Sequence, residues 1–500
     1  MDPTQTKVSP YESFIWEYSS PGRIGVSLPG LDVPESPLPK EIPLRQKLPL
    51  PEVSELEVVR HFTRLSRFNF SIDTHMYPLG SCTMKYNPKV NEVVASLEGF
   101  RDAHPLLSEE LCQGSLELLY RLQEALKELS GFSAVSLQPA AGAQGELAGV
   151  LIIRAYHRER GDTARRKILI PDSAHGTNPA SVSMAGFIAE QIPSDKRGNV
   201  DLSVLRQRCD ETVAGIMITN PNTLGLFEEQ IEEVTSLVHQ AGGLVYGDGA
   251  NFNALLGYLK PAHVGIDVMH FNLHKTFSTP HGGGGPGAGP IGVVSSLSPY
   301  LPGPMVQLHE GVLSSNQAKD VQKRYTLYYP EKSIGRMKSF YGNFAVLVRA
   351  YTYILQMGGE GLQAVAEHAV LNANYLRHLL QHRYPIPYSQ PCMHEFVATG
   401  DIAPGIHTMD IAKRLLDYGF HPPTVYFPLI VKEALMIEPT ETEARQTLEA
   451  FASALLSIAE EAISQPELLK EAPHITPVQR LDEVKAARDP VLNRKGISIG

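Results

Sequence analysis

The sequence predicts an α/β protein in which a large domain with a mostly parallel sheet is followed by a smaller α+β domain. From residue 132 to about 295, short apolar stretches alternate with amphipathic ones, and polar loops separate them. This alternation is typical of parallel strands that are connected by helices. After about residue 330, two long helical stretches, strand-like segments and a last helix follow instead. This change of pattern marks the second domain.

Length and composition are those of a soluble globular protein. A chain of 500 residues is too long for one core and predicts two or three domains. The net charge of -10 argues against non-specific binding to nucleic acids or membranes. The first residues, MDPTQTKVSPYESF, lack the apolar core and basic lead of a signal peptide. No apolar run reaches the roughly 18 residues that span a bilayer. We therefore expect a cytoplasmic protein.

The cysteines predict neither a metal site nor a disulfide framework. Cys82, Cys112, Cys209 and Cys392 are scattered without the spacing of metal ligands. This usage is typical of a reducing compartment. We expect no bound metal.

The N-terminal region, residues 1–115, is predicted to consist of an arm and a loop that lies beside a substrate. Residues 1–55 are rich in proline, which prevents long helices and central strands. Apolar Ile15, Trp16, Tyr18 and Leu31 favour an arm laid over a neighbouring subunit, although a disordered tail is the alternative. Residues 54–71 begin with a serine cap and predict a short helix.

The stretch 73–90, DTHMYPLGSCTMKYNPKV, has no periodicity and is predicted to be a loop. Loops so rich in polar donors either face solvent or surround a ligand. Ser81, Thr83 and Lys85 offer donors to a carboxylate, and His75 titrates near neutrality. Cys82 is a possible nucleophile, but a lone cysteine is more often simply packed.

The large domain, residues 116–335, opens with an amphipathic helix at 115–130 that Gly131 ends. A strand at 132–136 then leads into the small-residue turn AAGAQGE and a helix at 146–158. Free N–H groups at a helix start bind phosphate well. We therefore predict that Gly142, Ala143 and Gln144 cradle a phosphate, with a tight turn that binds no ligand as the alternative.

The alternation then continues through four further strands. They are expected at 166–171, 214–220, 244–251 and 267–274, with helices at 199–209 and 231–243 and a loop at 172–186 that opens another helix. In such sheets the ligand lies at the carboxyl ends of the strands. Polar residues fall at each of these ends: His175, Thr219, Asn220, Asn222, Asp248, His274 and Lys275. This agreement predicts a polar ligand site there.

Lys275 is the centre of the predicted site. Six glycines within eight residues, Gly282 to Gly289, follow it closely. Glycines let the backbone approach a bulky ligand, and an amine in a polar pocket can attack a carbonyl once it loses its proton. We therefore predict that Lys275 forms a Schiff base with pyridoxal phosphate, the alternative being a surface lysine before a flexible loop. A phosphate loop of the Walker type is disfavoured, because its lysine follows the glycines.

The other strand ends then receive roles around this cofactor. A carboxylate beside the ring nitrogen keeps the nitrogen protonated and so maintains an electron sink, and Asp248 is predicted to be that carboxylate. His175 is predicted to stack on the ring, unless it is an ordinary hydrogen-bonded loop residue. Asn220 is predicted to donate to the phenolic oxygen, although an Asn-Pro pair is also a common turn.

The smaller domain is predicted to span residues 336–465 and to close over the cofactor. Two long helices with a glycine break are expected within 339–380, strands within 384–400 and 423–439, and a last helix at 441–462. Arg336, at the junction of the domains, is a possible clamp for a substrate carboxylate. Residues 466–500 are charged, are interrupted by prolines and are predicted to form a surface tail.

Five motifs in this chain resemble those of the glycine dehydrogenases (decarboxylating), the P-proteins of the glycine cleavage system. They are YPLGSCTMKYNP, QPAAGAQGE, SAHGTNPAS, YGDGANFNA and NLHKTFSTPHGGGGPGAGP, spread over residues 77–290. The resemblance implies the aspartate-aminotransferase-like fold, fold type I of the enzymes that use pyridoxal phosphate. It places the cofactor-bearing lysine of this family at Lys275, with His274 beside it.

The resemblance also implies a reaction and partners. Glycine would be decarboxylated, and the remaining aminomethyl group would pass to the lipoyl group of the H-protein. The chain is similar to the separate second subunit of the split form, which implies subunit 1 as partner in a heterotetramer with two copies of each subunit. Two alternatives stay open: another fold-type-I enzyme, such as an aminotransferase or an amino-acid decarboxylase, and a catalytically silent structural subunit.

Overall fold

The computed structural model describes residues 12–44, 48, 50–281, 287–312 and 321–492. These residues belong to two compact units: residues 1–74 together with 471–500, and residues 75–470. The predicted large and small domains thus lie within one unit. Among the described residues, none of the helices has the length and apolar content needed to cross a membrane.

The first unit contains η1 (Ile15–Tyr18), α1 (Glu55–Ser66) and α13 (Glu483–Arg488). α1 begins at the predicted serine cap. The Ser54 hydroxyl accepts a hydrogen bond from the Glu57 N–H at 3.3 Å, and the Glu57 carboxylate accepts one from the Ser54 N–H at 2.9 Å. This reciprocal pair satisfies two N–H groups that the helix leaves free.

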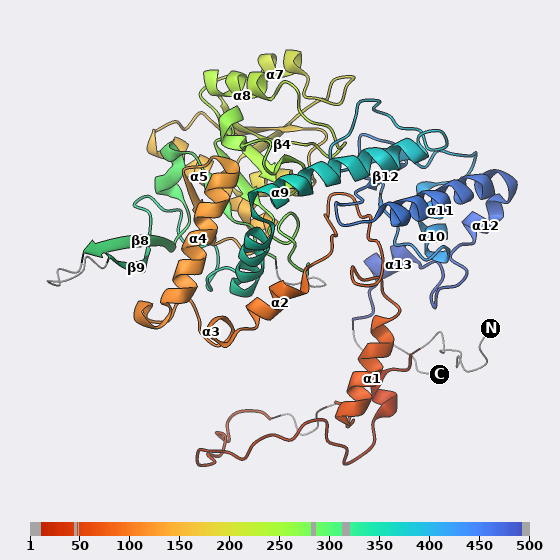
Figure 1. The fold of residues 1–500 in the computed structure, drawn as a ribbon, viewed down its shortest axis with the longest axis horizontal. Helices are drawn as coiled ribbons and strands as arrows, with labels where there is room; N and C mark the ends of the chain where they lie inside the picture. Colours follow the sequence, from red (N-terminus) through yellow and green to blue (C-terminus); the bar gives the residue numbers. More distant parts are fainter. Residues whose placement is uncertain (1–11, 45–47, 49, 282–286, 313–320, 493–500) are drawn as a thin grey trace. The chain divides into compact units, whose positions relative to one another are not determined.

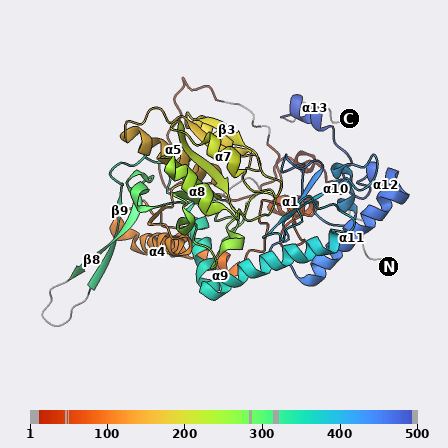
Figure 2. The same ribbon diagram turned by 90° about the horizontal axis from the view of Figure 1, so that it is seen from above.

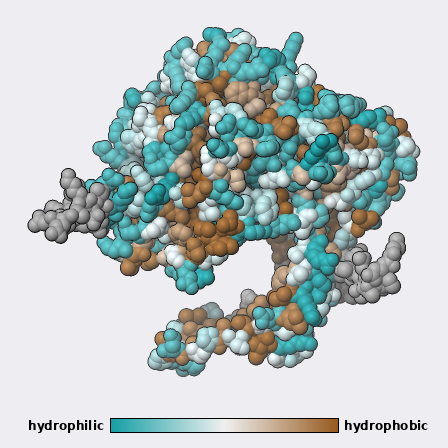
Figure 3. Space-filling view, viewed as in Figure 1, coloured by the Kyte–Doolittle hydropathy of each residue, from teal (hydrophilic) through white to brown (hydrophobic). Residues whose placement is uncertain are grey.

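The segment between η1 and α1 exposes many apolar side chains (Figure 3). Each of the following is between 49% and 82% exposed: Ile24, Val26, Leu28, Leu31, Val33, Leu38, Ile42, Leu44, Leu48 and Leu50. The prediction that this arm lies over a neighbouring subunit remains a prediction.

The second unit is built on a sheet whose strand β4 is labelled in Figure 1. This sheet has seven strands in the order β1-β7-β6-β5-β4-β2-β3. All neighbouring pairs among β3, β2, β4, β5 and β6 are parallel, and only β7 runs against its neighbours β6 and β1. This confirms the predicted mostly parallel sheet. The strands are β1 (Ala134–Ser136), β2 (Lys167–Pro171), β3 (Ile188–Ile192), β4 (Val213–Thr219), β5 (Leu244–Gly249), β6 (Val268–Phe271) and β7 (Ile291–Val293).

Helices cover both faces of this sheet. Successive side chains of a strand point to opposite faces: Tyr246 of β5 packs in the cluster that contains α5, while its neighbour Val245 packs with α8. The result is a three-layer arrangement in which the sheet core is closed on both sides. The helices of this part are α2 (Lys89–Ala95), α3 (Glu98–Arg101), α4 (Gln113–Ser130), α5 (Gly142–Glu159), α6 (Thr177–Met184), α7 (Leu202–Arg208) and α8 (Ile231–Gln240), with short 3-10 turns η2 (Glu109–Leu111), η3 (Asn253–Leu255), η4 (Pro261–Val264) and η5 (Ser295–Tyr300).

The smaller α+β part follows the long helix α9 (Phe344–Leu380), which runs from the sheet towards α10 and α11 (Figure 2). α9 has the predicted glycine break, because Gly358 adopts φ 61° inside it. The part contains an antiparallel sheet of β10 (Phe396–Thr399), β12 (Ala434–Ile437) and β11 (Thr424–Val425), packed with α10 (Thr408–Asp417), α11 (Arg445–Ser464) and α12 (Pro466–Lys470). The predicted smaller α+β region is confirmed.

Several elements were not predicted. β3 has the sequence IAEQI and three of its five residues are exposed, since it forms the sheet edge. β7 has only three residues. The hairpin β8 (Met305–Val312) and β9 (Val321–Tyr328) pairs only with itself in the described residues, so no alternation with helices marks it. α10 was also not predicted. It lies between the strands expected within 384–400 and 423–439, in a stretch to which the sequence analysis assigned no element.

Candidate active site

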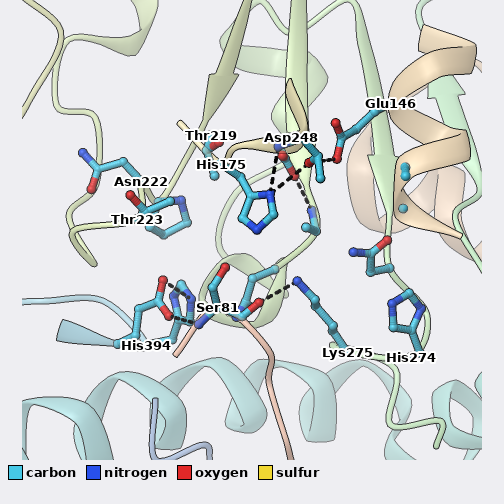
Figure 4. Close-up of a pocket in the computed structure, with 18 residues that line it drawn as sticks. Ser81, Glu146, His175, Thr219, Asn222, Thr223, Asp248, His274, Lys275 and His394 are labelled. Carbon is cyan, nitrogen blue, oxygen red and sulfur yellow. Dashed lines mark hydrogen bonds and ion pairs between the residues drawn. The ribbon is translucent and has the colours of Figure 1, made fainter. Parts of the chain in front are cut away.

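A cavity of about 210 Å³ lies at the carboxyl ends of the sheet strands (Figure 4). It receives residues from β4, β5, the segment after β6, the start of α5, the loop 73–90 and the segment before β10. The sequence-predicted residues that line it are Ser81, Gly142, Ala143, His175, Thr219, Asn222, Asp248, His274 and Lys275. The structure thus brings residues from widely separated parts of the chain to one place.

Lys275 follows β6 in a tight turn. Its N–H donates to the Asn272 carbonyl at 3.0 Å, and its own carbonyl accepts from the Ser278 N–H at 3.1 Å. The amine is partly buried, and its Nζ donates to the Ser81 carbonyl at 2.6 Å. This carbonyl holds the amine towards the cavity, where it meets the loop that carries Ser81.

Asp248 is the last residue but one of β5 and is only 4% exposed. Its Oδ1 accepts from the Ala250 N–H at 2.9 Å, and its Oδ2 accepts from the Asn178 amide at 3.1 Å. Burial acts to raise the pKa of Asp248, but the neighbouring His270 and these donors outweigh it and hold that pKa below its usual value. The site therefore contains a buried, ionised carboxylate.

Two residues behind Asp248 were not predicted. His270 of β6 is fully buried, and its Nε2 lies 3.7 Å from Asp248 Oδ1. Its Nδ1 forms a 2.5 Å hydrogen bond with the Tyr246 hydroxyl. Sequence periodicity alone assigns both residues to an ordinary buried strand, so it gave no signal for this contact.

Glu146 is a further unpredicted acid that lines the cavity. It lies on the first turns of α5, and its carboxylate accepts from Thr177 Oγ1 at 2.7 Å and from the Asn178 amide at 3.2 Å. Burial and the negative charge of Asp248 raise the pKa of Glu146 to about 7. Asn178 therefore bridges two carboxylates of which only one is ionised below neutrality. The sequence did contain a sign of this residue, because Glu146 is the last residue of the motif QPAAGAQGE, whose glycine and alanine were predicted to bind phosphate.

The start of α5 offers N–H groups to the cavity. The Gly145 N–H donates to the Ala141 carbonyl, so the N–H groups of the preceding helical residues have no acceptor within the helix. Gly142 and Ala143 line the cavity, whereas Gln144 does not, because its side chain turns back to accept from the Ala140 N–H at 2.8 Å. Gln144 therefore shapes the predicted cradle through its side chain.

The glycine at this helix start is required by close packing. A Cβ on Gly142 would lie 2.6 Å from Asn272 Oδ1. Asn272 Oδ1 and Thr219 Oγ1 are buried polar atoms without a hydrogen-bond partner in the described residues, and both residues line the cavity. Unsatisfied buried polar atoms are costly, so these atoms indicate a place for a polar ligand.

Two predicted histidines line the cavity with neutral rings. His175 Nδ1 lies 2.9 Å from Thr177 Oγ1, and burial lowers the pKa of His175. Burial and the neighbouring His281 lower the pKa of His274 to about 3, and its Nδ1 accepts from the Ala288 N–H at 3.3 Å. Of the glycine-rich segment that follows Lys275, residues 282–286 lie outside the described residues.

Three predicted residues do not reach the cavity. Lys85 is buried and donates to Glu441 Oε1 at 2.7 Å and to Asn253 Oδ1 at 3.0 Å, so its ammonium is not directed at a substrate. Thr83 donates through its hydroxyl to Glu438 at 2.7 Å. Asn220 accepts from the Glu228 N–H at 3.0 Å through its amide oxygen and is not a cavity-lining residue. A loop that is polar in sequence can bury its polar groups against a distant segment, which sequence alone does not show.

Three further candidates have other positions. His75 is exposed and does not line the cavity. Burial raises the pKa of the Cys82 thiol to about 11, which disfavours a nucleophilic thiolate. Arg336 is exposed and donates to the Tyr329 hydroxyl at 2.6 Å, away from the residues that line the cavity.

Family comparisons agree along most of the chain. The family described as "Glycine cleavage system P-protein" matches residues 27–418, and "Glycine dehydrogenase, C-terminal domain" matches residues 365–474. The chain is 55% identical over 488 residues to the probable glycine dehydrogenase (decarboxylating) subunit 2 of Desulforamulus reducens, covering 96% of this chain and 99% of that protein. It is 56% identical over 489 residues to the protein of the same name from Caldanaerobacter subterraneus subsp. tengcongensis, covering 96% and 98%.

Solved structures share the fold. The chain is similar to glycine decarboxylase (P-protein) of the glycine cleavage system in inhibitor-bound form, with a TM-score of 0.70, 24% identity and coverage of 84% of this chain and 93% of that one. It is also similar to the cysteine desulfurase of Thermococcus onnurineus NA1, with a TM-score of 0.57, 15% identity and coverage of 78% and 95%. These likenesses confirm the predicted aspartate-aminotransferase-like fold.

Proposed function

We propose, from the premise that the chain belongs to the glycine cleavage system P-protein family, that pyridoxal phosphate is held at Lys275 of this glycine-decarboxylating enzyme. The enzyme removes the carboxyl group of glycine and transfers the remaining aminomethyl group to a lipoyl group. The observation that carries the proposal is one cavity that contains a held amine, a buried ionised carboxylate and a free helix start.

The residues of the cavity fit this cofactor in character. The N–H groups of Gly142 and Ala143 suit a phosphate, because a helix start favours negative charge. Asp248 suits a protonated ring nitrogen, His175 suits the ring face, and Lys275 suits the aldehyde carbon. The unpartnered oxygens Thr219 Oγ1 and Asn272 Oδ1 are further polar atoms for the ligand. When bound, pyridoxal phosphate supplies an electron sink for the bond that breaks as CO2 leaves.

The chain's own residues prepare this chemistry. Asp248, ionised and buried, keeps a proton on the group that it faces, since charge pairs are strong where water is excluded. Lys275 Nζ is held at the Ser81 carbonyl, and this amine would hold the aldehyde carbon of the cofactor. Neutral His175 and His274 line the same cavity without adding positive charge that would compete for Asp248.

We further propose partners and a domain division. The name "subunit 2" of the relatives supports a second subunit as partner, and we propose a heterotetramer with two copies of each subunit. The lipoyl-carrying H-protein is the proposed acceptor, and glycine is the substrate. Residues 116–335 are proposed as the cofactor-binding domain and 336–465 as the smaller domain, which is supported by the separate apolar cluster around α10 and α11.

An absorbance experiment tests the cofactor and its lysine. Wild type, Lys275→Ala and the control Lys260→Ala are purified with pyridoxal phosphate, reduced with borohydride and mapped by peptide analysis. Lys260 is a matched control, because it pairs with Glu128 at 2.7 Å and does not line the cavity. We expect a band near the visible edge in wild type and control only, with the reduced label on the Lys275 peptide. A label on another lysine would refute the assignment.

The reaction is tested with carboxyl-labelled glycine, subunit 1 and lipoylated H-protein. We expect labelled CO2 only when all the proteins are present. Transamination of glycine without the H-protein would instead favour an aminotransferase.

A further inference from the structure

A second group of titratable side chains lies on the other side of Ser81 from Lys275 (Figure 4). His394 and Glu395 directly precede β10, and Glu438 directly follows β12. One ligand-type atom from each lies within 4.8 Å of the others, and all three residues are at most 3% exposed. We call these three residues the acid cluster. His394 and Glu395 line the cavity, and the proposed function assigns no role to them.

The two carboxyl groups of the acid cluster differ in their hydrogen bonds. Glu438 accepts from the Thr83 N–H at 2.9 Å, from the Thr83 hydroxyl at 2.7 Å and from the Asn251 amide at 2.8 Å. These three donors act to lower the pKa of Glu438, but burial outweighs them, so that pKa lies above its usual value. Glu395 accepts one hydrogen bond, from the Ser81 N–H to Oε2 at 2.7 Å. Burial and the charge of Glu438 raise the pKa of Glu395 well above its usual value, so Glu395 is the protonated member.

His394 completes a path from Glu395 to the cavity. The histidine is 1% exposed, and neither ring nitrogen has a hydrogen-bond partner in the part of the chain that the structure describes. Its Nε2 lies 3.6 Å from Glu395 Oε1, the oxygen that the Ser81 N–H leaves free. A neutral imidazole has one donor and one acceptor nitrogen. Burial lowers the pKa of His394 to about 3, so its ring is neutral. It can therefore accept a proton at one nitrogen while it donates from the other.

Ser81 connects this cluster with the lysine. Its N–H donates to Glu395 and its carbonyl accepts from Lys275 Nζ. Ser81 has φ 66°, a left-handed conformation that is rare for a residue with a Cβ. Such strain persists only where the surroundings fix it. The two hydrogen bonds fix the conformation of Ser81 here. They also place protonated Glu395 and the Lys275 amine on opposite sides of Ser81.

We propose that the acid cluster is the proton donor for the sulfur that leaves during aminomethyl transfer, with His394 as the residue that touches the lipoyl sulfur and Glu395 as the source of the proton. This inference rests on the proposed function and adds catalytic residues to it. Protonated Glu395 and the neutral ring of His394 favour such a role, because a departing thiolate gains a proton and meets no negative charge on either group.

The step balances in atoms and electrons. The carbon that has lost CO2 forms a bond with one sulfur of the dithiolane, and the S–S bond breaks. The second sulfur leaves with the electron pair and takes a proton from His394, which is restored from Glu395. The disulfide is reduced by two electrons, and the two carbons of glycine together lose these two electrons, one at the carbon that becomes CO2 and one at the carbon that binds sulfur. The proton that Glu395 gives up is replaced by the one that the glycine ammonium loses when it binds, so no other reactant is required.

The test separates glycine binding from transfer. The full chain with subunit 1, pyridoxal phosphate and lipoylated H-protein is compared with His394→Asn, Glu395→Gln and the control His407→Asn. Asparagine can still donate a hydrogen bond but cannot relay a proton. His407 is an exposed histidine of the same part that contacts Glu433 at 3.2 Å. Glycine affinity is measured by spectral titration and the new thiol by a thiol reagent in a single turnover.

We expect glycine affinity within about twofold in all variants. We expect thiol formation to fall about 100-fold in His394→Asn and Glu395→Gln, the scale of a lost general acid, and to stay unchanged in His407→Asn. Wild-type thiol formation should slow in deuterated water. The infrared difference between wild type and Glu395→Gln, measured above the Glu146 pKa of about 7, should contain the band of a protonated carboxyl, which tests the proton independently of activity.

Three results would overturn the inference. Unchanged thiol formation in His394→Asn would show that His394 takes no part in proton transfer. If thiol formation falls only as much as glycine affinity falls, His394 acts in glycine binding instead. Dependence of wild-type transfer on an added divalent cation, without the carboxyl band, would make the cluster a metal site. A wild type that does not decarboxylate glycine would refute the proposed function instead, and the infrared band would still decide whether Glu395 holds a proton.

Discussion

Replacing Lys85 by methionine separates a structural role of this residue from the substrate-binding role that the sequence suggested. The Lys85 and Glu441 side chains are 1% and 7% exposed, and Nζ lies 2.7 Å from Oε1. Lys85→Met leaves Glu441 with the Asn253 amide, at 2.9 Å, and the Tyr353 hydroxyl as neutral donors, and it leaves Asn253 Oδ1 without Nζ. Removing one partner of a buried ion pair lowers the free energy of unfolding by about 3–5 kcal/mol, because the other charge stays buried and unpaired.

The sign of the pH dependence follows from the pKa of Lys85. Burial acts to lower that pKa, but Glu441 outweighs it, so the pKa is raised above its usual value in the folded protein. A raised lysine pKa stabilises the fold at all pH values below the unfolded pKa, and the stabilisation is lost only as pH rises through the folded pKa. The difference between wild type and Lys85→Met should therefore be constant across neutral pH and shrink only in alkali.

The assay is urea unfolding, beside glycine titration of the folded protein. The double variant Lys85→Met with Glu441→Gln is the matched control, since it removes both charges and should recover part of the lost stability. Glycine affinity should stay close to that of wild type in both. An unchanged unfolding midpoint together with a large loss of glycine affinity would contradict the structural role and return Lys85 to the substrate side of the site.

Two further predictions concern the cavity. Gly142→Ala should weaken cofactor binding at least tenfold, measured by equilibrium dialysis, because the new Cβ would lie 2.6 Å from Asn272 Oδ1 and displace the N–H groups that bind the cofactor. A tenfold loss of affinity corresponds to about 1.4 kcal/mol of binding free energy. Gly114→Ala, which has open space and lies in α4, should bind the cofactor as wild type does, and equal weakening in both would contradict the packing argument. The folded pKa of Glu146, about 7, exceeds its ordinary value of 4.5, so the folded apoprotein binds this proton more tightly and its stability falls as pH rises from about 4.5 to 7. Glu146→Gln should reduce this slope in urea unfolding measured over that range, and an unchanged slope would show that Glu146 is not the titrating group.

Sequence reasoning located the sheet side of the cavity because one rule governs it. The carboxyl ends of parallel strands meet at one edge, so Asp248 and Lys275 could be placed together although the chain between them forms two 3-10 turns and a strand. The same reasoning missed β7 and the β8–β9 hairpin, since a three-residue strand and a hairpin outside the main sheet follow no strand–helix alternation.

The other side of the cavity depends on contacts that no local pattern encodes. Thr83 and Glu438 are hydrogen-bonded across more than 350 positions, as are Lys85 and Glu441. The loop 73–90 was predicted to face a substrate because it is polar, but its polarity is mostly used to join the smaller α+β part. Only Ser81, whose side chain was proposed as a donor, lies at the cavity, and its backbone makes the decisive contacts.

This division of contacts gives the cavity two sides with opposite electrical character. On the sheet side, Asp248 is ionised and lies beside Glu146, which titrates near neutrality. The negative charge of Asp248 therefore stabilises a positive charge on a ligand group that faces it. On the side of the acid cluster, Glu395 is protonated and His394 is neutral, so this side can release a proton. The proposed reaction moves electrons from the breaking C–C bond into the cofactor and then to a sulfur atom. It therefore needs a group that stabilises positive charge and a proton donor, and these two groups must lie at different places. Because the Ser81 N–H donates to Glu395 and the Ser81 carbonyl accepts from Lys275, the backbone of Ser81 would keep these two groups at fixed positions during that exchange.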